Sequence, residues 1–133
     1  MVAATRDLDI PQRMPVSGHS YGYPVKAGVR IFKRAMVGIT ADKLAVPVGA
    51  AGCVAVIGLA TNAVDNRTGV DGEVQVRVDK GVFRMPFAAA APSNIRAQVF
   101  ALDDQTLQLT NANSALLAGT LDAIDAEGVW IRL

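Results

Sequence analysis

Short β-prone runs separated by turn residues fill the chain after residue 24. The clearest is residues 73–79, where Val74, Val76 and Val78 alternate with polar side chains, as in a strand with one buried face. Residues 53–60 are almost continuously apolar, which predicts a strand buried on both faces. Further strands are expected at 29–39, 44–48, 82–87, 95–102, 106–110, 116–124 and 129–133. About nine short strands without a long helix predict an all-β fold, either a small β-sandwich or a partly open barrel.

Residues 1–24 show neither the strand nor the helix period. Pro11, Pro15, Gly18, Gly22 and Pro24 interrupt regular structure there. We therefore expect an extended N-terminal arm over residues 1–24, followed by a β domain over residues 25–133. The arm also carries apolar and amphipathic residues that a free tail would not need, which suggests that it lies along another surface; these are Ile10, Met14, Val16, Tyr21 and Tyr23.

The last run, residues 129–133, places Val129, Ile131 and Leu133 on one face and Trp130 on the other. The aliphatic face is expected to point to the core. Trp130 is then expected to be at least half buried beneath the arm or a neighbouring subunit, with an acceptor for its indole N–H.

Composition limits the class of protein. The chain has 133 residues, of which half are hydrophobic and 19% charged, so it has enough apolar material for one core. The net charge of +1 gives no global signal for nucleic acid or membrane lipid. Residues 1–34 carry six basic and two acidic groups, and the remainder carries seven basic and ten acidic. This asymmetry is either chance or the mark of a basic side that faces an acidic partner.

Residues able to support catalysis are scarce. His19 is the single histidine and Cys53 the single cysteine, which is expected to be a buried small hydrophobe. Asp103, Asp104, Asp122, Asp125 and Glu127 fall at turns or strand ends, where solvated acids are expected.

No ligand-binding motif stands out either. The 65–71 loop, with Asp65, Asn66 and Asp71, lacks the EF-hand spacing, and no phosphate-binding glycine motif occurs. We therefore predict a non-enzyme without catalytic, cofactor or metal site. No signal peptide or membrane span is expected, and the cysteine usage suits the cytoplasm.

One stretch offers an alternative function. Arg30, Phe32 and Arg34 alternate on one face of the strand expected at 29–39, a mixture that an OB-like single-stranded nucleic-acid-binding module could use. One aromatic residue is a poor platform for stacking bases, so Phe32 is better explained as part of a core or an interface.

The chain resembles the small capsid decoration, or cement, proteins of tailed bacteriophages, including the lambda-type head-stabilising proteins. Three features carry the resemblance. The first is the Pro/Gly-rich arm before an Ala/Gly/Val-rich β domain, and the second is the valine-alternating strand and the strand that follows it in residues 72–83. The third is the ending over residues 118–133, where an acidic-Gly turn precedes a final alternating strand.

This resemblance implies a virion structural protein that binds the outer surface of the assembled capsid as a homo-dimer or homo-trimer. The protein would be made in the host bacterial cytoplasm, contact the major capsid protein and stabilise the shell, without nucleic-acid or membrane partners. Another phage virion β-domain, from a tail or baseplate, stays open as an alternative. The capsid-binding candidates, chosen from the arm and the basic strand, are Arg6, Ile10, Arg13, Met14, Tyr21, Tyr23, Arg30 and Arg34.

Overall fold

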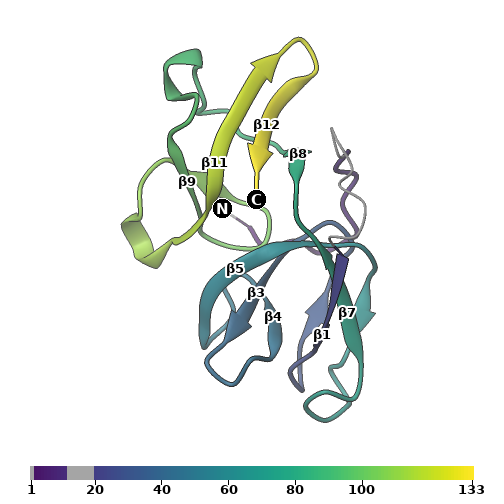
Figure 1. Ribbon diagram of the computed structural model, residues 1–133. Coiled ribbons are helices and arrows are strands. Elements are labelled where there is room, and N and C mark those ends of the chain that lie inside the picture. The colour runs from purple at the N-terminus through teal and green to yellow at the C-terminus, as the bar shows by residue number, and fades with distance from the viewer. Residues whose placement is uncertain (1, 12–19) are drawn as a thin grey trace.

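The computed structural model describes residues 2–11 and 20–133, and Figure 1 shows a lower and an upper group of strands. The lower group is a five-stranded sheet in the order β1-β7-β5-β3-β4, and the upper group is a second five-stranded sheet in the order β10-β9-β11-β12-β8. β2 and β6 form a small third sheet, and all strand pairs are antiparallel. The predicted all-β class is confirmed, and the arrangement is sandwich-like and not closed into a barrel.

The strands of the first sheet are β1 (Ser20–Pro24), β3 (Met36–Thr40), β4 (Ala45–Pro47), β5 (Cys53–Ala60) and β7 (Gln75–Asp79). Those of the second are β8 (Val82–Arg84), β9 (Gln98–Ala101), β10 (Leu107–Gln108), β11 (Leu116–Asp125) and β12 (Gly128–Arg132). The small sheet contains β2 (Arg30–Ile31) and β6 (Val64–Asp65), and two short 3₁₀ helices span Pro92–Asn94 and Ala112–Ser114.

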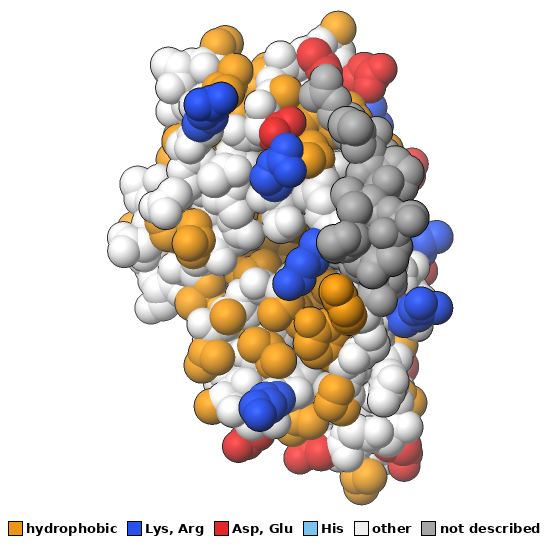
Figure 2. Space-filling view, in the orientation of Figure 1, with side chains coloured by type: hydrophobic (Ala, Val, Ile, Leu, Met, Phe, Trp, Pro, Cys, Tyr) orange, Lys and Arg blue, Asp and Glu red, His pale blue; other side chains and the backbone are white. Residues whose placement is uncertain are grey.

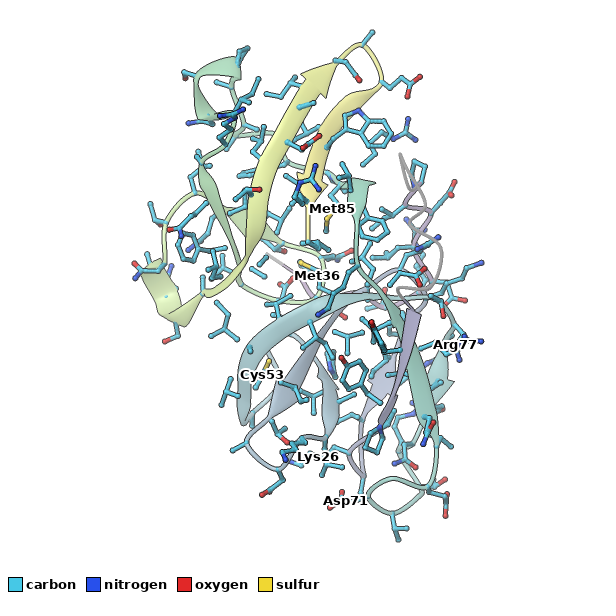
Figure 3. All side chains as sticks on the ribbon, in the orientation of Figure 1. Lys26, Met36, Cys53, Asp71, Arg77 and Met85 are labelled. Carbon is cyan, nitrogen blue, oxygen red and sulfur yellow. The ribbon has the colours of Figure 1, made fainter. Side chains whose placement is uncertain are left out.

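Two apolar clusters form the core, one on each face of the first sheet. The first cluster lies where the two sheets meet and includes Met36 and Met85, which Figure 3 labels between the two groups of strands. The second cluster lies on the other face of the first sheet and contains Val37. Because Met36 and Val37 are neighbours in β3, they point to opposite faces and each joins a different cluster.

The alternation in β7 is confirmed. Val76 and Val78 are buried in the second cluster, and Val74 packs against it from just before the strand. Gln75 and Arg77 between them are exposed. The period-2 pattern therefore identified both this strand and its buried face.

The strand over residues 53–60 has the predicted bounds, but its burial differs along its length. Leu59 and Ala60 are fully buried, whereas Val54 and Ala55 are exposed. Side chains pack alternately into the two clusters only in the second half of β5, where the strand passes between the two cores. There Gly58 is needed, because an added Cβ would lie 2.4 Å from the carbonyl oxygen of Asp79.

The first sheet curls until its ends approach each other. Val25, which follows β1, forms an isolated parallel bridge with Ala45 of β4, and Lys26 N–H donates to the Ala45 carbonyl at 3.0 Å. β2 and β6 cover the second cluster with Ile31 and Val64. The bridge and the small sheet therefore cover one side of the second cluster. The strands of the first sheet do not form a closed ladder.

The expected arm over residues 1–24 needs correction at its end, because the β domain begins before residue 25. Ser20–Pro24 is β1, and its residues Tyr21 and Tyr23 pair with Val78 and Val76 of β7.

The N-terminal strap, which we define as residues 2–11, also packs on the β domain. Ile10 is buried in the first cluster and Leu8 packs against it. Ile10, which was predicted to contact another molecule, therefore serves the chain's own core.

The strap crosses from one sheet to the other. Leu8 N–H donates to the Lys33 carbonyl at 2.8 Å, beside the first sheet. The Pro11 carbonyl accepts from Arg84 N–H of β8 at 3.0 Å, on the second sheet. These main-chain bonds hold the strap along the junction of the two sheets.

The single strand expected over residues 29–39 is wrong. Arg30–Ile31 and Met36–Thr40 are separate strands in different sheets, and between them Arg34 has a φ of 64°. Arg34 N–H donates to the Ala60 carbonyl at 2.8 Å, a tertiary contact that holds the turn and that no local pattern reveals. Arg30, Phe32 and Arg34 therefore do not share one strand face.

Trp130 lies on the final strand, as predicted, and is only 5% exposed. Its indole N–H donates to the carboxylate of Asp125, with both oxygens at 3.0 Å. Ile131 is fully buried, and Val129 and Leu133 pack against the first cluster. The predicted burial, acceptor and aliphatic core face are confirmed.

Candidate docking surface

The part of the second cluster that no strand covers forms an open apolar face. Tyr21 and Tyr23 stand opposite Val78 and Val76, so these tyrosine rings point to the same side as the buried valines. Yet Tyr21 is 50% exposed and Tyr23 is partly exposed, which places them at the rim of the cluster. Figure 2 shows hydrophobic side chains gathered over the first sheet, in the lower half of the molecule.

Strands β3 and β5 supply the other side of this surface. Ile39 stands opposite Ala45, a buried member of the second cluster, and also opposite Ala55. Ala55 is exposed, and Ile39 and Ile57 are half-buried. We call Tyr21, Tyr23, Ile39, Ala55 and Ile57 the open face.

The open face suits binding by apolar contact, with the tyrosine hydroxyls as its polar groups. Tyrosine combines a large ring with a hydroxyl and loses little rotamer freedom when it is covered. The aliphatic residues of β3 and β5 add apolar area on the other side of the face. Such a surface can hold another protein surface.

Further exposed aliphatic residues lie outside the open face. Val54 of β5 is 56% exposed and Leu117 of β11 is 51% exposed. The exposure of both was not predictable from the sequence, because each lies in an apolar run that resembles a buried strand. A side chain in such a run shows its exposure only when the packing of the neighbouring sheet is known.

The candidates from the arm separate into different environments. Arg6 is exposed on the strap. Ile10 is 6% exposed within the core, so its assignment as a docking anchor is corrected. Arg13 and Met14, together with His19, lie outside the described residues. Of the predicted apolar anchors that the structure describes, Tyr21 and Tyr23 stay accessible.

The candidates from the basic stretch are held apart. Arg34 forms an ion pair with Asp79 at 3.5 Å and stands 5.7 Å from the ring centre of Phe83, so it supports the fold at the end of β7. Arg30 is exposed and stacks on Phe32 at 4.5 Å from the ring centre. Because Arg30 covers one face of this ring, Phe32 is a poor site for stacking a nucleic-acid base.

The cysteine is not activated for nucleophilic chemistry. Cys53 is partly exposed, and its thiol points toward Gly38, where an added Cβ would lie 2.1 Å from Sγ. Burial raises the pKa of the Cys53 thiol, which favours the unreactive protonated form at neutral pH. The hollow that it borders, about 220 Å³, has mainly small and aliphatic walls.

Two carboxylates are buried, contrary to the expected solvated acids. Asp103 is 9% exposed, and its Oδ1 accepts the backbone N–H groups of Gln105 and Thr106. Asp104 is 3% exposed, and its Oδ1 accepts Ala4 N–H at 2.8 Å. Both act as acceptors that fix the turn and the strap.

Three further findings bear on the class of protein. Over residues 2–11 and 20–133, His, Cys, Asp and Glu side chains form no group of three or more that could hold a metal ion. In the same residues, no helix has the length and apolar character needed to cross a bilayer. No family model matches the chain, and no curated protein or solved structure matches it either.

Proposed function

We propose that this protein is a virion structural protein that binds the outer surface of an assembled capsid, contacts the major capsid protein and stabilises the shell without catalysis. The resemblance to tailed-phage decoration proteins supports this role. Several copies would sit on the capsid exterior, as homo-dimers or homo-trimers.

The open face is the observation that carries the proposal. A soluble β-protein normally keeps the rings beside a core cluster covered, whereas here Tyr21 is 50% exposed beside its strand partner Val78, which is 1% exposed. Large amphipathic rings at the edge of a desolvated cluster are typical anchors of protein interfaces. We therefore propose the curled first sheet as the docking site, whereas the candidates from the sequence came from the arm and the basic strand.

The strap suits a capsid-stabilising role in a second way. Because it is bonded to the turn before β3 and to β8, it holds the two sheets together. The open face is then ordered before binding, so docking loses less conformational entropy. Repetition of a modest contact over a shell multiplies its effect through avidity.

The test is co-sedimentation of the full chain with bare capsid shells. Ala55→Glu places a charge in the open face at an already exposed position, so the fold should persist and binding should fall about tenfold or more. Val70→Glu is the matched control, because Val70 is 66% exposed and lies in the loop before β7. Equal binding of the Ala55→Glu variant and the wild type would remove the open face as the docking site.

A second measurement separates capsid from tail. Intact particles, with and without the protein, are compared by gel mobility and by mass per particle. A decoration protein adds many copies to tailless shells. Failure to bind tailless shells, together with binding to isolated tails, would overturn the capsid assignment.

A further inference from the structure

Asn66 holds a buried oxygen that the fold leaves without a donor. The side chain is 1% exposed, and its Nδ2 donates to the carbonyls of Val25, Lys26 and Val70 at 3.1, 3.2 and 2.9 Å. These three acceptors fix which end of the amide is nitrogen. Among the described residues, Asn66 Oδ1 has no hydrogen-bond partner. A buried acceptor left in this state is costly, so it calls for a donor or a cation.

A second oxygen points to the same small space. A Cβ added to Gly69 would lie 2.1 Å from Asn66 Oδ1 and 2.3 Å from Glu73 Oε2. Both oxygens therefore lie close to one point beside the Gly69 Cα, where they take the place that a side chain would need, so only glycine fits here. Glu73 is exposed and has no ion pair within the described residues, so its charge is available to a ligand.

The neighbouring charged groups in this loop are already engaged. Arg67 binds Asp65 at 2.7 Å, and this hydrogen bond lowers the pKa of Asp65 to about 2. Asp71 Oδ1 accepts Ala27 N–H at 2.8 Å, which ties the loop to the turn after β1. Asp71 and Lys26 mark this end of the molecule, far from the junction of the two sheets, in Figure 3. The loop is therefore held in shape around Asn66 without using its Oδ1.

We propose that the loop over residues 65–73 binds a calcium ion through Asn66 Oδ1 and the Glu73 carboxylate. Amide and carboxylate oxygens are the ligands that calcium prefers, and its flexible coordination allows water to supply the remaining positions. In this proposal the ion lies between the two oxygens, on the side away from the Gly69 Cα. With one charged ligand, the site has an affinity in the range of about 10⁻⁴ to 10⁻³ M, as in weak extracellular modules.

The experiment uses the full chain freed of metal with EDTA and then titrated with CaCl₂ to about 10 mM, with NaCl at matched ionic strength as the reference. Calcium should raise the melting temperature by about 3 °C. The side-chain amide signals of Asn66 should shift and saturate in a ¹H–¹⁵N spectrum. Glu73→Gln, which removes the charge at an exposed position, should abolish both responses.

Glu127→Gln is the matched control, because Glu127 is an exposed carboxylate in the turn between β11 and β12. It should respond to calcium as the wild type does. A response equal to that in NaCl, or a Glu73→Gln variant that still responds, would overturn the site. A larger response to MgCl₂ would overturn the assignment to calcium. The capsid-binding proposal is unaffected by either result, since the loop and the open face are tested separately.

Discussion

Asp104 shows how one residue can join distant parts of the chain while weakening the fold as pH rises. Its Oδ1 accepts Ala4 N–H from the strap, and its backbone carbonyl accepts Met36 N–H of β3 at 2.8 Å. Burial, and to a lesser extent the charge of Asp103, raises the pKa of Asp104 above its ordinary value of 3.8. The folded state therefore holds the Asp104 proton more tightly than the unfolded state does.

This shift gives a pH prediction for Asp104→Asn, which keeps an oxygen acceptor and removes the charge. The stabilising contribution of the raised pKa is fully present below pH 3.8 and is lost as the pH rises through the folded-state pKa. The variant should therefore gain stability relative to the wild type between pH 4 and pH 7. Urea unfolding at both pH values measures the difference, with exposed Asp42→Asn as the control. A difference that is the same at both pH values would show that the Asp104 charge is not penalised by the fold.

Single residues were predictable where periodicity decides burial. Val76 and Val78 follow from alternation, and the need of Trp130 for an indole acceptor follows from its chemistry. Asp103 and Asp104 were not predictable, because turn acids are normally solvated. Asp104 accepts from the strap, which arrives from a distant part of the sequence, whereas Asp103 accepts from Gln105 and Thr106 in its own turn.

At the scale of elements, the strap behaves as part of the sandwich. We predict that Ile10→Ala lowers the free energy of unfolding by about 2–5 kcal/mol, because it removes a buried side chain from the first cluster. Arg6→Ala, at an exposed position of the same strap, should change stability by less than about 0.5 kcal/mol. Urea unfolding compares the two variants. If Ile10→Ala unfolds as the wild type does, the strap is not anchored in solution.

The positions of single strands were easier to predict from the sequence than the elements with which they pair and pack. β5 has the predicted bounds, and β7 and β12 fall within one or two residues of them. The run over 29–39 failed because Arg34 turns the chain through a positive φ that depends on Asp79 and Ala60, both distant in sequence. β1 was missed because Gly22 and Pro24 are unusual within a strand, and here they belong to a five-residue edge strand.

For the whole molecule, the net charge of +1 and the apolar open face give one further prediction. Capsid binding should change by less than about threefold between low and high NaCl, because exposed charges are screened and contribute little. Arg6→Gln combined with Arg30→Gln should bind nearly as well as the wild type. Affinity that falls steeply with salt, and falls further in this double variant, would place the contact on the basic residues.

The candidate surface was only partly predictable from the sequence. Tyr21 and Tyr23 were identified as amphipathic anchors, and both lie on the open face. Ala55 and Ile57 were hidden within an apolar run, since a sequence does not show where a curled sheet stops being covered. Asn66 was passed over because its unpartnered oxygen results from three backbone carbonyls that only the fold brings together.

The strap also fixes an order of events while the chain is being made. Ala4 emerges from the ribosome 100 residues ahead of its partner Asp104. At about 5–20 residues per second, Ile10 and its neighbours wait roughly 5–20 s before the upper strands exist to receive them. The strap residues thus find their place late, and until the upper strands have been made the nascent chain presents an apolar segment without its packing partners.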